Sequence, residues 1–442
     1  MGRRPGPGPR RSRSRRAIAW AGGLALATGV VIAACGPGPG PEFRPVLDID
    51  FPEPDAVDAV ILLIGDAGQG ERGTSPILQR LRSDVEFWSE RLAADSAVTV
   101  LFLGDNVYPV GVRDRDHRQF PTDSLRLWSQ IEVVAGPAAL ARGTRGLFMA
   151  GNHDWGNMAG RRGLARLRNE QEQIDSARGM GLPVWLLPEA GEPGPAVLDL
   201  QDRVRLLLMD THWFLQERSG RARARFFTDL RKGLEEAGDR HVILAAHHPY
   251  ESAGPHGALA PGAKAFGLLW LMKKSGTLVQ DLNSPIYEDL LRQLLSSFRL
   301  VERRPLIFAA GHDHSLQVLD PATDYGPETV LVSGAGSKLT DLAVSPQLRY
   351  AAARPGYMTL VFRQNEAVDL FVTAADSTDV TCPAEPEEAR LSCMGDRATA
   401  MKLVYSERLV PEGGAPSAVV GASEVTDTAG GRSAPGRLPP RR

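Results

Sequence analysis

A series of short apolar runs, each stopping at a small or polar residue, restricts the fold of this chain more than any other feature. Strands without apolar/polar alternation are buried on both faces. Longer stretches with a helical pattern separate the runs, at 75–95, 123–134, 161–178, 221–237 and 286–298. The sequence therefore predicts an α/β or α+β layered domain with helices covering a sheet or a pair of sheets. The runs are AVILLIG, VTVLFLG, GLFMAG, VRLLLMD, HVILAAH, RPLIFAAG, ETVLVSG and YMTLVF.

Residue types that bind metals follow five of these runs. In layered α/β folds, ligands gather at the carboxyl ends of the strands, so these residues are expected to converge on one edge. Carboxylate and amide oxygens together with imidazole nitrogens suit ions such as Mn, Fe and Zn, and one carboxylate can bridge two ions. Two ions about 3.5–4 Å apart can clamp both oxygens of a phosphoryl displacement. In chain order, the residues are Asp66, Asp105, Tyr108, Asn152, His153, His247, His248, His312 and His314.

Each of these clusters also has an ordinary explanation. An aspartate after a strand is commonly a turn or cap residue, and a single histidine is usually a satisfied surface or core residue. Five such clusters at five predicted strand ends favour a shared metal centre over five separate turns.

The motifs GD-x-G, GDNVY, GNHD, AAHHP and GHDH occur in this order along the chain. As an ordered set, they resemble the five blocks of the calcineurin-like metallophosphoesterase superfamily, and most closely its purple acid phosphatase, tartrate-resistant acid phosphatase-like branch. The resemblance covers roughly residues 57–372. It implies a four-layer α/β-β/α sandwich, the metallo-dependent phosphatase fold, with a dinuclear metal centre between two sheets.

The resemblance also implies a role for each matching residue. Asp105 would bridge two ions, Tyr108 would bind iron(III), and the second ion would be Fe, Zn or Mn. His153 would contact the phosphate and assist the leaving group, and His256 in ESAGPHG would be a second substrate-facing histidine. Ligands of the first ion would be Asp66, Tyr108 and His314, and those of the second ion Asn152, His247 and His312.

The sequence departs from the superfamily pattern in several places. Gly68 stands where most members have a histidine ligand, which agrees with the tyrosine-containing branch if Tyr108 supplies the missing ligand. The region 258–304 is longer than in the small enzymes of that branch, so substrate preference does not carry over. His248 is expected to be a neighbour of the ligands. No role is assigned to His117, His212 and His241.

These features predict a dinuclear-metal hydrolase that cleaves phosphate monoesters by attack of a metal-bound hydroxide, with His153 protonating the leaving oxygen. Two alternatives remain open. One is a phosphodiesterase or nucleotide pyrophosphatase on the same fold, because the five blocks supply metal ligands and do not determine which type of phosphate ester is cleaved. The other is a catalytically silent surface-binding protein. No protein partner can be inferred.

The N-terminal segment is typical of an exported protein. Seven arginines within 3–16 precede an uncharged apolar run, 17–34, that ends in VIAAC. This pattern predicts a signal peptide over 1–34. It resembles a lipobox, which implies lipidation of Cys35 and a cell-envelope lipoprotein anchored to a bacterial membrane. A single transmembrane anchor is the alternative.

Behind the signal, the sequence predicts a Pro/Gly-rich linker over 35–55, the metallophosphoesterase domain over 56–375, and an extension over 376–442 that is disordered from about 413. Removing the seven N-terminal arginines changes the formal net charge from −2 to −9, which argues against nucleic acid as the main partner. Cys382 and Cys393 either pair or stay free thiols, and the sequence leaves both possibilities open.

Overall fold

The computed structural model describes Gly2 and residues 46–69, 75–93, 96–158, 160–216, 220–257, 282–321, 323–376, 393, 396–398 and 400–414. Contacts divide the chain into two units, residues 1–42 and 43–442, and all elements below belong to the second. Cys35, Cys382 and the predicted signal peptide lie outside the described residues. Cys393 lies within them and is disulfide-bonded. Among the described helices, none is long and apolar enough to cross a membrane.

The first sheet has eight strands in the order β1-β15-β14-β13-β2-β3-β4-β5. Strands β2, β3, β4 and β5 run parallel, as strands linked by helical crossovers do. The bounds are β1 (Val46–Leu47), β2 (Val57–Ile64), β3 (Ala97–Phe102), β4 (Arg145–Phe148), β5 (Val184–Leu186), β13 (Gly356–Arg363), β14 (Val368–Ala374) and β15 (Lys402–Val410).

The second sheet has seven strands in the order β12-β10-β11-β9-β8-β7-β6. Its central strands β7, β8, β9 and β11 are parallel. Every apolar run named above forms a strand in one of the two sheets. The bounds are β6 (Ala196–Leu200), β7 (Val204–Leu208), β8 (His241–Ala245), β9 (Ile307–Ala310), β10 (Leu316–Leu319), β11 (Thr329–Ser333) and β12 (Leu348–Ala352).

The predicted helices are present with small shifts at their ends. Helix α3 begins three residues before its predicted start because Pro121 suits the first helical turn. Helix α9 begins after Ser284, whose Oγ accepts a hydrogen bond from Tyr287 N at 3.3 Å. The helices are α2 (Pro76–Arg91), α3 (Phe120–Ile131), α4 (Pro137–Arg142), α5 (Gly160–Gly179), α6 (Thr211–Gln216), α7 (Gly220–Glu235) and α9 (Pro285–Leu300).

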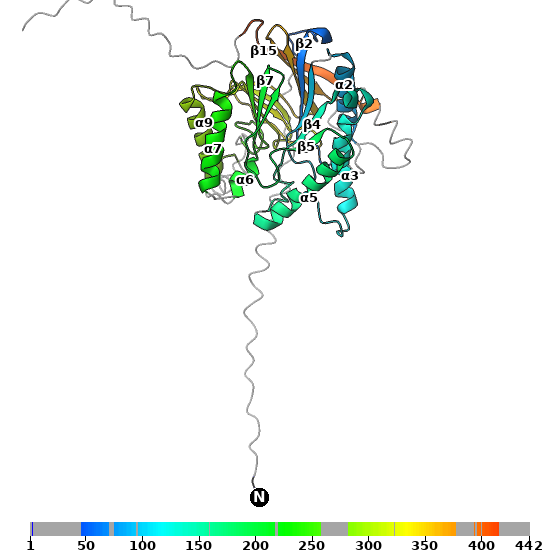
Figure 1. Cartoon of the computed structure of the whole chain (residues 1–442), viewed down its shortest axis with the longest axis vertical. Helices are drawn as coiled ribbons and strands as arrows, with labels where there is room; N and C mark the ends of the chain where they lie inside the picture. Colours follow the sequence, from blue (N-terminus) through cyan, green and yellow to red (C-terminus); the bar gives the residue numbers. More distant parts are fainter. Residues whose placement is uncertain are drawn as a thin grey trace, which may run out of the picture. The chain divides into compact units, whose positions relative to one another are not determined.

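Side chains that alternate along the strands build separate packing layers. In β2, Ala59, Ile61 and Leu63 belong to a core made of strand and loop residues from both sheets. The intervening Val60 and Leu62 belong to the core that also holds buried residues of the helices. Helices α2, α3 and α5 cover one sheet, and α6, α7 and α9 cover the other (Figure 1). The predicted four-layer α/β-β/α sandwich is therefore confirmed.

The C-terminal extension contributes a strand to the first sheet. Strand β15 pairs antiparallel with β14, and β1 pairs parallel with β15 at the edge. The predicted domain boundary at 375 therefore cuts through a sheet that continues to Val410. The pattern of continuous apolar runs decays after Thr373 in the sequence, because β15 carries Ser406, Glu407 and Arg408 in its middle. These polar residues are held by Ile49 O, Arg349 and Asp369.

Candidate metal centre

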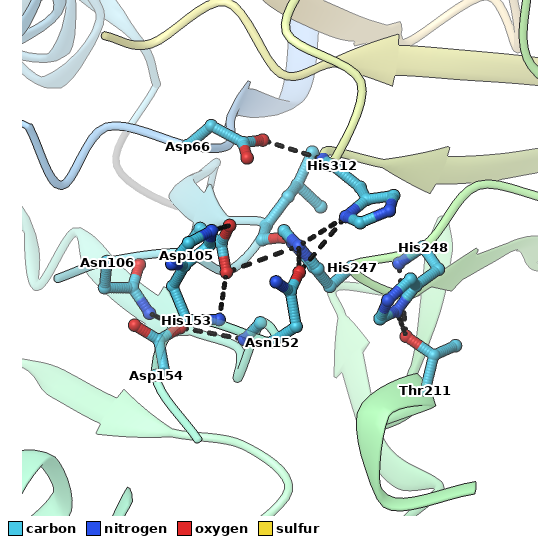
Figure 2. Close-up of polar contacts among 12 residues, drawn as sticks. Asp66, Asp105, Asn106, Asn152, His153, Asp154, Thr211, His247, His248 and His312 are labelled. Atoms are coloured by element: carbon cyan, nitrogen blue, oxygen red, sulfur yellow. Dashed lines mark hydrogen bonds and ion pairs between the residues drawn. The ribbon is translucent and has the colours of Figure 1, made fainter. Parts of the chain in front are cut away.

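The carboxyl ends of five strands meet where the two sheets face each other. Asp66, Asp105 and Asn152 follow β2, β3 and β4, which are neighbours in the first sheet. His247 and His312 follow β8 and β9, which are neighbours in the second sheet. Figure 2 shows these five side chains grouped around one space. The sequence-predicted convergence is therefore present.

Asn152, His247 and His312 form the first group of donor atoms. His247 Nε2 lies 3.0 Å from Asn152 Oδ1 and 3.2 Å from His312 Nδ1, and the last two atoms are 3.1 Å apart. Donors bound to one ion at about 2.1 Å stand about 3.0–3.4 Å from one another. The three atoms are therefore spaced as ligands of a single ion.

Asp66, Tyr108 and His314 form the second group. Tyr108 Oη lies 2.8 Å from Asp66 Oδ1 and 3.2 Å from His314 Nε2, and the latter two atoms are 3.4 Å apart. The spacing again matches ligands of one ion. The same six residues that the resemblance divides between two ions thus form two separate groups of donor atoms.

Asp105 lies between the two groups. Its Oδ1 is 3.4 Å from His247 Nε2. Ligand atoms of Asp66, Asp105 and His247 all lie within 4.8 Å of one another, and all three residues are buried. This buried group could bind a metal ion, and the Asp105 carboxylate is in reach of both groups.

Three of these side chains sit on backbone in the left-handed region. The φ angles of Asp66, Asp105 and His312 are 59°, 57° and 69°. Positive φ is uncommon outside glycine and is maintained only when surrounding contacts enforce it. Asp66 Oδ2 accepts from His312 N at 2.8 Å, which ties two of the strained turns together. Strain of this kind is concentrated at functional sites.

The backbone around Gly68 leaves no room for a side chain at that position. A Cβ atom at Gly68 would lie 2.4 Å from the carbonyl of Asn106, so no side chain fits there. The backbones of the two loops are joined by Gly68 N to Asp105 O at 3.2 Å and Tyr108 N to Gly68 O at 3.1 Å. A histidine ligand at this position is therefore sterically excluded, and Tyr108 Oη occupies the second donor group instead.

Contacts outside the donor groups fix the orientation of the imidazoles. His247 Nδ1 lies 2.8 Å from Leu103 O, so it carries the proton and leaves the lone pair of Nε2 facing the centre. His248 Nδ1 lies 2.7 Å from Thr211 Oγ1, away from both groups (Figure 2). As a result, His248 stands beside the ligands, with its ring 4.3 Å from that of His312.

The two predicted substrate-facing histidines also lie at the centre. His153 Nδ1 is 2.6 Å from Pro109 O, and His153 Nε2 is 3.9 Å from Asp105 Oδ2. The His153 side chain is 24% exposed, whereas Asp66, Asp105 and His247 are buried. The His256 ring centroid lies 4.2 Å from that of His312. Both rings therefore reach the metal-binding region.

Burial and charge shift the pKa values of the donor residues in opposite directions. Burial alone would raise the pKa of Asp66, but His314 and His247 outweigh it and lower that pKa. Burial lowers the pKa of His314, yet the Asp66 carboxylate raises it overall. The pKa of His312 is well below its ordinary value, mainly because of burial. Neutral imidazole and ionised carboxylate are the forms that bind metal ions.

A buried pair of carboxyl groups supports the loops that carry the ligands. Asp154 accepts hydrogen bonds from Val107 N at 3.0 Å and Gly151 N at 2.8 Å. Asn106 Nδ2 donates to Glu170 at 3.0 Å and to Asp154 at 3.3 Å. Burial raises the pKa of Glu170 to about 8, and burial followed by the Glu170 charge raises that of Asp154. A proton is therefore held in this pair at neutral pH.

Glu170→Gln is expected to flatten the pH dependence of stability. The pKa of Glu170 in the folded protein, about 8, lies above its ordinary value of 4.5. The protonated carboxyl therefore contributes fully to the free energy of unfolding below pH 4.5, and this contribution disappears as the pH rises through 8. Glutamine can still accept the hydrogen bond from Asn106 Nδ2 and has no titrating proton. Thermal unfolding of both proteins from pH 5 to 9 should show a decline that is shallower in the variant. Parallel curves would contradict this assignment.

Several residues at the centre were not predicted from the sequence. Lys338, in the loop after β11, places its amino group 3.3 Å from the ring centroid of Tyr108. His212 is fully buried, with its ring 6.4 Å from that of His248. The run VRLLLMD offered a signal, because β7 also ends at this edge and Asp210 to His212 follow it. His117 and His241 lie elsewhere, in an exposed loop and at the opposite end of β8.

No family model matches this chain, and no curated protein matches it. Solved structures are similar at low identity, among them the following three. GAP50, described as the anchor in the inner membrane complex of Plasmodium, is 14% identical with a TM-score of 0.47, covering 81% of this chain and 99% of that one. Purple acid phosphatase PPD1 from yellow lupin (Lupinus luteus) seeds is 15% identical with a TM-score of 0.45, covering 75% and 54%. PhoD is 11% identical with a TM-score of 0.49, covering 80% and 73%.

Proposed function

We propose that this protein is a dinuclear-metal phosphoric ester hydrolase that cleaves phosphate monoesters, in the manner of an acid phosphatase. The observation that carries the proposal is the pair of donor groups, each spaced for one ion, with the Asp105 carboxylate between them. Two bound ions would supply a nucleophile by lowering the pKa of coordinated water and would offset charge on the phosphoryl oxygens. A silent binding protein has no need of strained turns that hold both groups.

The assigned ligands divide as the resemblance implies. Asp66, Tyr108 and His314 would hold one ion, and Asn152, His247 and His312 the other, with Asp105 shared. The donor set supports transition ions, because it combines carboxylates, imidazoles, one amide and one phenol. The phenol favours Fe(III) at the first position, paired with Fe, Zn or Mn at the second.

His153 would act on the leaving group. Its Nδ1 is held by Pro109 O, so Nε2 faces the centre from its partly exposed edge. An imidazole so placed can donate the proton that the leaving alkoxide needs. His256, whose backbone N–H donates to Asp313 Oδ1 at 3.3 Å, would assist from the other side.

The site is proposed to work in the cell envelope. The arginine-rich head, the apolar run and VIAAC support export and lipidation of Cys35, which would hold the domain at a bacterial membrane. The substrate would then be a phosphate ester on the outer side of that membrane. Radiolabelled fatty acid should enter the wild-type protein and should not enter a Cys35→Ser variant.

Metal analysis and a substrate panel test the proposed function. The purified protein should contain two ions per chain and hydrolyse a small aryl phosphate monoester. Turnover of a bis-aryl diester alone would support a phosphodiesterase or pyrophosphatase instead. A protein with neither metal nor turnover would be the silent binding protein.

His153→Ala is expected to retain both ions and to lose about 10²–10⁴-fold in turnover, because it removes the proton donor and leaves the ligands in place. Activity against esters with good leaving groups should fall less, since they need no proton. His117→Ala, in an exposed loop, is the matched control and should behave like the wild type. Full activity of metal-replete His153→Ala would contradict this role.

A further inference from the structure

Lys338 is a cation at the edge of the candidate metal centre, and the function proposed above gives it no role. Its Nζ lies 3.3 Å from the ring centroid of Tyr108, in a cation–π contact. Among the described residues, no carboxylate forms an ion pair with it and no acceptor receives its hydrogen bonds. The three ammonium hydrogens are therefore free to bind an oxygen anion that enters the site.

The position of Lys338 is fixed by the loops that carry the ligands. Gly336 N donates to Gly65 O at 3.1 Å, and Ser337 Oγ donates to Asp66 O. On the other side of Lys338, Thr340 N donates to His314 O at 3.0 Å. The lysine backbone is thus tied on both sides to loops of the first donor group, from which its side chain reaches the Tyr108 ring.

The partly exposed residues around the site differ in charge from its buried residues. The carboxylates of Asp66 and Asp105 are buried, at 0% and 1% exposure. Partly exposed groups around them are basic: His153 contacts the Tyr108 ring with centroids 4.4 Å apart, and Lys338 covers the ring face. An approaching ligand therefore meets basic groups first, which favours an anion with more than one charge.

We propose that Lys338 binds a non-bridging oxygen of the phosphoryl group and thereby selects dianionic phosphate monoesters over monoanionic diesters. This inference rests on the proposed function. Coulomb attraction scales with the charge of the ligand, so a fixed cation favours the dianion. A diester also carries a second alkyl or aryl group in place of one of the free oxygens that Lys338 would bind.

Lys338→Met tests the proposal, because methionine keeps an apolar stem over Tyr108 and removes the charge. In the metal-loaded full-length protein, inorganic phosphate should bind about tenfold or more weakly by titration calorimetry. The value of kcat/KM for a monoester should fall by a similar factor, whereas that for a diester should fall less. Lys338→Arg should recover most of the phosphate affinity. Lys232→Met, which removes an exposed lysine of α7, should change nothing.

Three results would overturn the proposal: unchanged phosphate affinity in Lys338→Met, an equal loss for both ester types, or a loss of bound metal. The last would show that Lys338 maintains the centre and does not contact substrate. Failure of the proposed function is distinct, because there the wild type itself would lack metal or turnover. If the wild type is active and Lys338→Met has the same phosphate affinity and turnover, the role of Lys338 is contradicted and the proposed function still stands.

Discussion

Asp105→Asn is expected to leave fewer than two ions per chain and to lower turnover by about 10³-fold or more. Its carboxylate lies within 4.8 Å of ligand atoms of Asp66 and His247, and its Oδ1 is 3.4 Å from His247 Nε2. Asparagine keeps the shape and removes the charge and one acceptor oxygen. As the proposed shared ligand in a buried site, Asp105 would have no replacement, so the binding of both ions would be weakened together. Elemental analysis and monoester turnover measure the two effects.

Asp210→Asn is the matched control for Asp105→Asn. Asp210 is also a buried aspartate after a strand, but it accepts from Trp155 Nε1 and Trp213 N, both at 2.9 Å, and from no ligand. The control should keep both ions. Equal metal loss in the two variants would show that disturbed packing causes the loss. Full metal content in Asp105→Asn would exclude Asp105 as the bridging ligand.

The convergence of these residues was predictable because strand order and parallel direction leave little freedom at a sheet edge. Once β2, β3 and β4 are buried neighbours, the residues that follow them share one edge. The same holds for β8 and β9. Tyr108 was predictable from its place in the GDNVY motif together with the glycine at position 68, and the structure adds that close contact with Asn106 leaves no room for a side chain at Gly68.

Other parts of the centre depend on packing that no local pattern records. Glu170 lies within a polar helical stretch, where a glutamate is normally exposed, yet it is 0% exposed because α5 packs on the ligand loops. Lys338 follows a predicted strand, but its place over Tyr108 depends on hydrogen bonds to Gly65, Asp66 and His314. Strand β15 was missed because its middle residues are polar and are paired only in the folded sheet.

Tyr108 offers the sharpest test of metal identity. Its hydroxyl is buried against Asp66, and burial followed by the charges of Asp105 and Asp66 raises its pKa well above 10. A phenolate therefore cannot form in this site near neutral pH unless a strongly charged cation offsets both carboxylates. A trivalent ion bound here would do so, and a phenolate–iron(III) bond absorbs visible light.

Tyr108→Phe is accordingly expected to remove the visible absorption of the iron-loaded protein while keeping its fold. Phenylalanine retains the ring that packs against His153 and Lys338 and removes only the oxygen. Tyr287→Phe is the control, because its buried hydroxyl donates to His248 O and Pro249 O, outside both donor groups. It should leave the spectrum unchanged. A colourless wild type with two ions and full turnover would instead make this a Mn- or Zn-dependent enzyme, in which Tyr108 is a neutral hydrogen-bond donor to Asp66.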